Sequence, residues 1–262
     1  MIIHCDNRYI PAVREYLGED RVLCFYLYMD MVQYGAEDEN TDLWLCEADG
    51  VRAVFYRYHN AIHMFSRGDW PRDEVEDFFR AHPAKVVTMS ETDAEALGAL
   101  FDGCALELSH VITATKTMTG RDDLDIRPAG RDDAAAIAEL MMRDATYNTV
   151  YSFDELYEQT LERLESGFGR LFVIRRGERV IATNCTAAET EDMAVISGLV
   201  TDPTERGQGL GRAITAYTWN LVREEGKMGL AHLACDNENT VRLHRQMGYD
   251  FLGIRARFLK EQ

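Results

Sequence analysis

Features of membrane, secreted and metal-binding proteins are scarce in this 262-residue sequence. Its longest apolar run, residues 22–29, is well short of the ~20 residues that cross a bilayer. The N-terminus lacks a basic patch followed by an apolar stretch, so we expect no secretory signal. The six cysteines form no C-x-x-C pair and have no clustered histidines. This argues against a zinc site or a disulfide framework and favours a reducing cytoplasm.

Basic residues are also scarce: Lys and Arg number 28 against 45 Asp and Glu, which gives a net charge of −17. Such a charge repels phosphate backbones and anionic lipid, so we expect no nucleic-acid or membrane partner. A cationic amine would be attracted, although an acidic surface also simply keeps a protein soluble. Any anionic ligand must be held by local geometry that works against the overall charge.

The remaining composition, 46% hydrophobic and 28% charged, is that of a folded protein of one or two domains. The best boundary is T-G-R-D-D at residues 119–123. After it, S-F-D-E is a capping box in which Ser152 and Glu155 start a helix that Gly167 ends. The pattern predicts strands at 125–127, 170–175, 179–186, 193–201, 229–235 and 249–258, and helices at 131–143, 210–225 and 239–247. We therefore expect an α/β (α+β) domain with a mixed sheet.

The N-terminal half repeats this order. We predict a hairpin at 44–56, a helix at 71–81, a strand at 85–89, a helix at 92–100 with a T-D-A-E capping box, and a strand at 105–118. The sequence thus predicts two copies of one fold, with domains at 1–120 and 121–262. Chance similarity of element order is the alternative, because few residues are identical.

The most informative segment follows the strand that ends at Thr201. Pro203 prevents the strand from continuing, and three alternating glycines, Gly207, Gly209 and Gly211, precede a helix. Such a loop turns backbone N–H groups inward beside a helix N-terminus, and so it predicts a pyrophosphate cradle. Neither the G-x-x-x-x-G-K-[ST] nor the G-x-G-x-x-G spacing is present. A plain tight turn is the alternative.

R-x-x-G-x-G at 206–211, N-x-x-x-x-x-L-H-x-x-x-G-Y at 237–249 and I-R-P-A-G-R-D-D at 126–133 together resemble the GNAT superfamily of N-acetyltransferases. The resemblance covers residue 125 to the end and implies a tandem GNAT-like fold of two domains. The matching stretch of the N-terminal half, residues 66–73, has only Gly68. That half is therefore expected to be a degenerate copy that does not bind coenzyme A (CoA), with Tyr56, Tyr58, His59 and Trp70 lining an acceptor pocket or lying in the core.

The resemblance implies acetyl-CoA as cosubstrate and no metal. The residues expected to bind it are Leu199, Val200, Thr201, Arg206, Gly207, Gln208, Gly209, Leu210, Gly211, Arg212, Asn237 and His244. Asn237 also suits a helix N-cap. His244 stands where many members carry a tyrosine that acts as general acid, or it is an exposed helix residue. Glu191, beside Glu189 and Asp192, is the candidate general base, or these carboxylates form a solvated turn.

The expected function is a cytoplasmic acyltransferase that moves acetyl from acetyl-CoA to a primary amine, with a small molecule as acceptor, by direct attack in a ternary complex. One alternative is a CoA- or acyl-CoA-binding sensor or scaffold without turnover. Another is an anion- or nucleotide-binding module unrelated to CoA. The sequence leaves the amine and the oligomeric state open.

Overall fold

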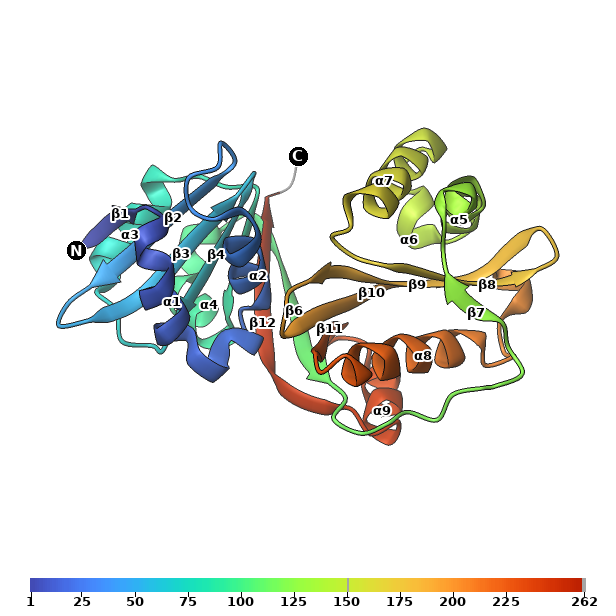
Figure 1. Cartoon of the computed structure of the whole chain (residues 1–262). Coiled ribbons are helices and arrows are strands. Elements are labelled where there is room, and N and C mark those ends of the chain that lie inside the picture. Colours follow the sequence, from blue (N-terminus) through green and yellow to red (C-terminus); the bar gives the residue numbers. More distant parts are fainter. Residues whose placement is uncertain (150, 261–262) are drawn as a thin grey trace. The chain divides into compact units, whose positions relative to one another are not determined.

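Two compact units make up the chain in the computed structural model, which describes residues 1–149 and 151–260 (Figure 1). The first unit comprises Met1–Ile112, His232–His244 and the described part of Phe251–Gln262. The second comprises Thr113–Ala231 and Arg245–Asp250. The expected domain boundary between 120 and 121 stays a prediction. The packing units interleave near the end of the chain because its last strand pairs with a strand of the first unit.

The first unit contains a sheet in the order β1-β2-β3-β4-β5-β12-β6. Its strands are β1 (Ile2–Cys5), β2 (Thr41–Glu47), β3 (Val51–Tyr58), β4 (Ala61–Ser66), β5 (Val86–Ser90), β6 (Cys104–Thr113) and β12 (Asp250–Lys260), and its helices are α1 (Ile10–Leu17), α2 (Phe25–Tyr34), α3 (Arg72–Ala81) and α4 (Glu91–Leu97). Neighbours from β1 to β4 are antiparallel, β4 and β5 are parallel, and β5 and β12 are antiparallel. The parallel pair requires a crossover, which α3 supplies.

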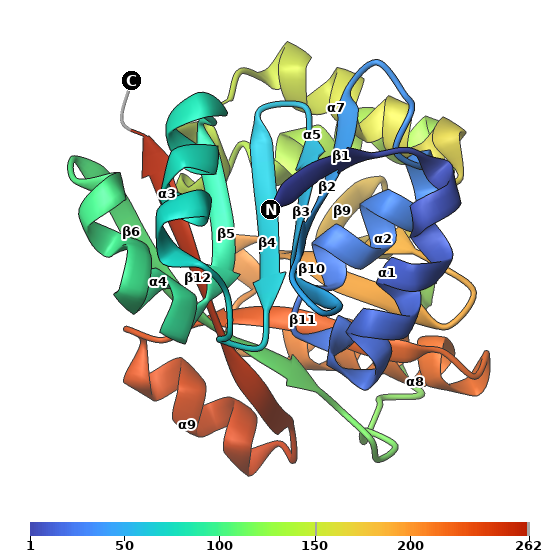
Figure 2. The same ribbon diagram turned by 90° about the vertical axis from the view of Figure 1, so that its left-hand side faces the viewer.

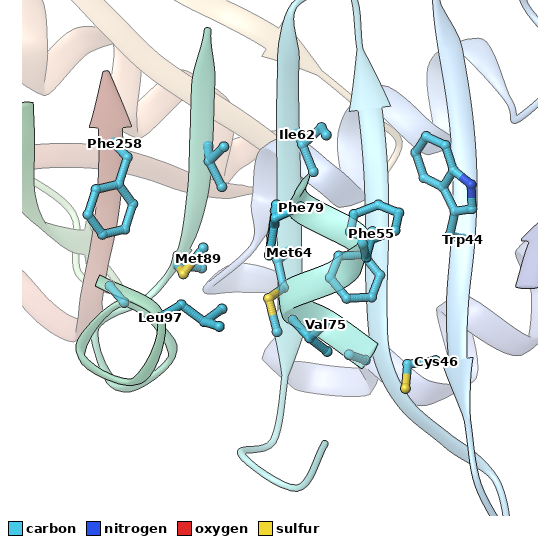
Figure 3. Packing of buried hydrophobic residues seen from close by; sticks show 14 of the residues in the cluster. Trp44, Cys46, Phe55, Ile62, Met64, Val75, Phe79, Met89, Leu97 and Phe258 are labelled. Atoms are coloured by element: carbon cyan, nitrogen blue, oxygen red, sulfur yellow. The ribbon is translucent and has the colours of Figure 1, made fainter. Parts of the chain in front are cut away.

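Helices cover both faces of this sheet (Figure 2). Alternating residues of each strand point to opposite faces, so Phe55 and Met64 pack against α3 and α4 (Figure 3). Val75 and Phe79 of α3 and Leu97 of α4 complete that side of the core. On the other face, Tyr56 donates a hydrogen bond to the carbonyl of Gly35, the residue after α2, at 2.7 Å.

The second unit has a sheet in the order β7-β8-β9-β10-β11. Its strands are β7 (Ile126–Pro128), β8 (Leu171–Arg176), β9 (Arg179–Glu189), β10 (Met193–Thr201) and β11 (Met228–Ala234), and its helices are α5 (Ala134–Met141), α6 (Ala145–Asn148), α7 (Phe153–Ser166) and α8 (Leu210–Glu224). The last helix of the chain, α9 (Glu238–Gln246), falls partly in each unit. Strands β7 to β10 are antiparallel, and β10 and β11 are parallel.

Helices α5 to α7 lie over one face of the second sheet and α8 over the other (Figure 1). Ile137 and Leu140 of α5 pack against Val173, Val180 and Val200. On the other face, Leu210 and Ile214 of α8 pack against a second set, Phe172, Ile174, Ile181 and Ala182. The two helix layers bury both faces of the strands, which explains the apolar runs at the centre of these strands, such as Leu171–Ile174 of β8.

The predicted duplication is confirmed by the topology. In each unit an antiparallel meander ends in a parallel strand, with one crossover helix between the last two strands, α3 in the first unit and α8 in the second. The fold is therefore a mixed α/β fold in two copies.

The capping predictions had mixed outcomes. Ser152 caps α7 and Glu155 reaches back to its amide at 2.7 Å, as predicted, with Gly167 in the left-handed region. The T-D-A-E capping box is wrong: Ser90 caps α4 instead, accepting a hydrogen bond from the amide of Asp93 at 3.0 Å. The helix begins one residue earlier than expected because Ser90 is itself a good N-cap at a strand end.

Two further observations concern the whole chain. The six cysteines, all within the described residues, are free thiols. Across the described ranges, no helix has the length and apolar character needed to cross a bilayer.

Candidate active site

Strands β10 and β11 are paired only at their start. Residues 193–195 pair with 228–230, and in the described chain no pairing between these strands continues beyond Val195. Strand β10 runs on to Thr201 along β9, while β11 continues to Ala234. The two parallel strands thus diverge, and an unpaired strand edge presents N–H and C=O groups to which an extended ligand can bind. We call this divergence the β10–β11 splay.

A bulge in β10 lies at the splay. The register of β10 against β9 shifts between Ser197 and Val200, so that Gly198 and Leu199 are the bulged residues. Gly198 has φ of 66°, and a Cβ on it would lie 2.7 Å from the Sγ of Cys185. Both facts require glycine here. Leu199 is 50% exposed although it belongs to an apolar strand, so the bulge removes its side chain from the core.

The glycine loop, residues 206–212, connects the 3-10 turn η5 (Pro203–Glu205) to α8. Gly207 and Gly209 have φ of 80° and 75°, and a Cβ on Gly207 would meet nothing within 4 Å. Beyond the hydrogen bonds of η5 and α8 themselves, no backbone amide from Arg206 to Arg212 donates to a described residue. These amides adjoin the N-terminus of a 15-residue helix, which carries roughly half a positive charge. The loop therefore has the properties of a diphosphate cradle.

The two arginines of the loop differ in their surroundings. The Nη2 of Arg206 donates to Oδ2 of Asp144 at 3.0 Å, and its Nε donates to the carbonyl of Thr201 at 3.3 Å. Arg212 is exposed, and no ion pair or hydrogen bond joins its side chain to the described residues. Arg206 thus fixes the loop, while the guanidinium of Arg212 is available to an anion.

Asp202 anchors the start of the loop from inside the protein. It is 0% exposed, and it accepts hydrogen bonds from the amide and hydroxyl of Thr204 at 2.9 and 2.7 Å. Its other oxygen pairs with Arg143 at 2.7 Å and with Arg179 at 2.5 Å. Burial alone would raise the pKa of Asp202, but these hydrogen bonds and charges outweigh it and hold the pKa below its ordinary value.

Arg121, in the expected boundary segment 119–123, contacts the glycine loop. Nη1 of Arg121 donates to the carbonyl of Gln208 at 2.8 Å. The side chain of Gln208 in turn donates to the carboxylate of Glu205 at 2.8 Å. The same carboxylate pairs with Arg176 at 2.6 Å. Gln208 is therefore held by its neighbours, and only its backbone remains for a cofactor. The same holds for Val200 and Leu210, whose side chains lie in the core at 2% and 3% exposure.

A pocket of about 220 Å³ lies beside the bulge, between α5–α7 and strands β8–β10. Tyr147, Tyr151, Arg163, Cys185 and Gly198 are among its lining residues. Nη1 of Arg163 donates to the Sγ of Cys185 at 3.1 Å, a weak acceptor, and no described carboxylate pairs with this arginine. Burial raises the pKa of Tyr147, so its phenol is protonated at neutral pH. The pocket thus combines a cation and phenols with an apolar wall.

Residues 134–249 match the model of the Acetyltransferase (GNAT) family. The matched range contains the splay, the bulge and the glycine loop. This segment is a GNAT acetyltransferase domain.

Solved structures, two of them of proteins described as GNAT proteins, share the fold of the whole chain. An acetyltransferase from the GNAT family of Colwellia psychrerythraea is 11% identical, with a TM-score of 0.60 over 100% of both chains. A Drosophila protein is 12% identical, with a TM-score of 0.64 over 98% of both. A tandem GNAT protein from the clavulanic acid biosynthesis pathway is 14% identical, with a TM-score of 0.56 over 100% of this chain and 99% of that one. These identities show the fold alone, which is that of a tandem GNAT protein. No curated protein matches the sequence.

The predicted GNAT asparagine and histidine lie at α9. The Oδ1 of Asn237 accepts the amide of Thr240 at 3.1 Å, so Asn237 caps this helix. The Nδ1 of His244 lies 2.8 Å from the carbonyl of Thr240, which can only accept, so Nδ1 carries a proton. Both residues belong to the first unit, whereas the glycine loop belongs to the second. Their roles toward cofactor and leaving group stay predictions.

The predicted base, Glu191, is exposed in the turn between β9 and β10. At ~3.3 Å per strand residue, the bulge at Gly198 is roughly 20 Å away along β10. Glu189 accepts from Arg170 at 2.7 Å and from Lys227 at 2.5 Å; burial opposes its ionisation, but these bonds lower its pKa. This placement favours the alternative of a structural, solvated turn, and the base role of Glu191 stays an untested prediction.

Sequence reasoning missed three features of the site. Gly198 had a signal, since an isolated glycine inside an apolar strand indicates a bulge. Arg163 also had one, because it shares the helical face of Leu156 and Thr160 in α7. Arg121 had none, since its contact with the glycine loop joins residues far apart in the sequence.

Proposed function

We propose that the protein is an acetyl-CoA-dependent N-acetyltransferase of the cytoplasm that acts on the primary amine of a small molecule. The observation that carries the proposal is the glycine loop, whose backbone amides from Arg206 to Arg212 have no acceptors outside η5 and α8, next to the β10–β11 splay. A diphosphate suits these amides and the guanidinium of Arg212, and a pantetheine arm suits the open edge of β10. Bound acetyl-CoA supplies an already activated thioester.

The proposed acetyl transfer has a single bond exchange at the acetyl carbon. The amine nitrogen forms an amide bond to the acetyl carbon, the carbon–sulfur bond breaks, and the sulfur departs with the proton that the nitrogen loses. A backbone N–H of the β10 edge near Val200 is proposed to stabilise the developing oxyanion. We propose that His244 relays this proton: it donates one to the departing sulfur and regains one from the nitrogen. Positioning in the pocket contributes much of the rate, because the acyl group needs no further activation.

The pocket beside Gly198 supports an acceptor with an anionic group. Arg163 is half-buried there, and the only hydrogen bond of its guanidinium to a described residue is to the sulfur of Cys185. A carboxylate or phosphate on the acceptor would give this guanidinium a stronger partner. A polyamine, which the overall charge of −17 would attract, would instead meet a like charge at this position. We therefore place zwitterionic amines, such as amino acids, ahead of polyamines.

Calorimetric titration of acetyl-CoA tests the cofactor site. Gly209→Trp fills the loop and is expected to abolish binding. Gly226→Trp is the matched control, because Gly226 follows the other end of α8, has φ of 78° and likewise has open space around it. Equal affinity of both variants and wild type would disprove the assigned cradle.

Turnover separates the enzyme from the alternative of a CoA-binding sensor. Thiol release from acetyl-CoA is followed with amino acids on one side and spermidine or putrescine on the other. We expect release with the zwitterionic amines. Binding of acetyl-CoA without release for any amine would support the sensor, and faster release with polyamines would contradict the role given to Arg163.

A further inference from the structure

The first unit contains a cavity of about 240 Å³ that the proposed acetyl transfer does not use. It lies between α2 and the sheet face formed by β4, β5 and β12. Cys24 and Tyr26 line it at the start of α2, and His63, Thr88 and Arg255 line it from the strands. All of its lining residues belong to this unit, so the cavity is a property of the first unit by itself.

The cavity occupies the counterpart of the β10–β11 splay. Strands β4 and β5 pair in parallel over residues 61–63 and 86–88 only, just as β10 and β11 pair over three residues. Residues 64–67 and 88–90, at the ends of these strands, line the cavity. The diphosphate cradle is missing here, because the amide of Gly68 donates to the hydroxyl of Ser66 at 3.1 Å. The duplicated fold thus keeps an opening between parallel strands but lacks the loop that holds CoA.

Arg255 places an uncompensated positive charge in the cavity wall. Its Nη1 lies 3.2 Å from Nδ1 of His232, and its guanidinium lies 5.0 Å from the ring centre of Tyr26. No carboxylate of the described chain pairs with it. Burial lowers its pKa to about 10, so it remains charged at neutral pH. A cation removed from water without a counter-ion costs free energy, and a bound anion would offset that cost.

The two imidazoles near Arg255 add no charge, and of the two His63 lines the cavity whereas His232 does not. Burial lowers the pKa of both His63 and His232 to about 3, so both are neutral. Arg255 can only donate, so Nδ1 of His232 accepts and its Nε2 carries the proton. This Nε2 is buried and has no partner among the described residues. His63 is satisfied by the hydroxyl of Thr88 at 2.7 Å.

Most of the wall is apolar. Asp30 does not line the cavity but lies 3.8 Å from Nε2 of the lining residue His63, and burial raises the pKa of Asp30 to about 7. Asp20 and Arg67 pair with each other at 2.7 Å. Leu23, Leu27, Met64, Phe65, Met89 and Ile254 supply apolar surface. The volume equals that of about eight waters at ~30 Å³ each, which suits a ligand of similar size. We propose that this cavity binds a small aryl or branched alkyl monocarboxylate, with its carboxylate on Arg255 and its apolar body against α2.

Calorimetric titration of the full-length protein with 3-phenylpropanoate, in the absence of acetyl-CoA, tests this proposal. The outcome is thus independent of the acetyltransferase assignment. We expect saturable one-to-one binding, at least about tenfold tighter than that of the neutral 3-phenylpropanamide, because a charge-assisted hydrogen bond to Arg255 is lost with the amide. Equal binding of acid and amide, or no saturable binding of either, would overturn the proposal.

Two variants on β12 test whether Arg255 is the residue that binds the carboxylate. Arg255→Gln is expected to weaken 3-phenylpropanoate binding by about tenfold or more. Arg257→Gln is the matched control, since Arg257 lies two residues further on β12 and already pairs with Glu107 at 3.1 Å. It is expected to leave the affinity within about twofold. Similar affinities in both variants would refute the role of Arg255.

Alkylation of Cys24 gives a readout on the unaltered protein, should Arg255→Gln fail to fold. Cys24 lines the cavity, whereas Cys104 does not, and because burial raises the pKa of the Cys24 thiol, each rate is compared with that of the same cysteine in the ligand-free protein. We expect 3-phenylpropanoate to slow alkylation of Cys24 and to leave Cys104 unchanged, as measured by peptide mass spectrometry. Protection of neither cysteine, or protection of Cys24 by acetyl-CoA but not by the carboxylate, would show that the cavity does not take this ligand.

Discussion

Replacing Gly198 by alanine tests whether the β10 bulge has the geometry on which the site depends. Two separate penalties are expected. A left-handed backbone costs a non-glycine residue ~1–2 kcal/mol. In addition, the new Cβ would lie 2.7 Å from the Sγ of Cys185, closer than real contacts allow, and overpacking of this kind costs ~1–3 kcal/mol. The second unit is therefore expected to lose about 2–5 kcal/mol of unfolding free energy.

Two companion variants separate the penalties. Gly167→Ala carries only the backbone cost, because Gly167 has φ of 71° and open space around it. Adding Cys185→Ala to Gly198→Ala removes the sulfur and leaves the Cβ of residue 185 at 3.8 Å, an ordinary contact. The double variant is thus expected to recover the overpacking cost, with a favourable coupling of ~1–3 kcal/mol.

Urea unfolding followed by far-ultraviolet circular dichroism measures these differences, and acetyl-CoA titration measures their effect on the site. We expect Gly198→Ala to weaken acetyl-CoA binding, whereas Gly167→Ala leaves it unchanged. Equal unfolding free energies for Gly198→Ala and Gly167→Ala would refute the close contact with Cys185. Additive effects in the double variant would refute it as well.

Three further predictions concern charged residues of the second unit. Arg212→Gln is expected to weaken acetyl-CoA binding about tenfold in calorimetry, by the loss of a charged hydrogen bond, and Arg206→Gln less, because Arg206 already pairs with Asp144. Arg163→Ala is expected to raise KM for a zwitterionic amine more than it lowers kcat, with partial rescue by Arg163→Lys; an unchanged KM would contradict the anchoring role. Because the folded-state pKa of Asp202 lies below its ordinary value, Asp202 stabilises the fold above the unfolded-state pKa of ~3.9, and this contribution is lost as pH falls through the folded-state pKa. Asp202→Asn is therefore expected to lower the urea midpoint at pH 7 and to make it less dependent on pH below ~4, whereas an acid dependence equal to that of wild type would contradict the linkage.

Local signals in the sequence predicted most of the fold. The capping box at Ser152, the glycine that ends α7 and the apolar runs of the strands each act over a few residues, so they can be read without knowledge of the fold. The glycine loop was predictable for the same reason. Its proposed function resides in consecutive backbone amides of one segment, which need no partner from elsewhere in the chain.

Contacts between distant residues were not predictable. The sequence does not indicate that Arg121 binds the carbonyl of Gln208 or that Arg163 lies against Cys185. It did not reveal that β12 pairs with β5, which makes the packing units interleave. Closeness in the sequence can also mislead. Glu191 lies two residues before β10, yet the extended strand separates it from the bulge at Gly198.

Arginines without a carboxylate partner stand out in a protein with so many acidic side chains. With 45 acidic and 28 basic side chains, a carboxylate is within reach of most arginines, and many of those in this fold have one. Arg163, Arg212 and Arg255 have no carboxylate partner in the described chain. Two of them line pockets, and the third adjoins the glycine loop. In a protein with such an excess of acid, an arginine kept free of carboxylates is better explained by an anion that comes and goes than by a structural role. The overall charge thus repels anions in general, and we propose that these three arginines each bind one.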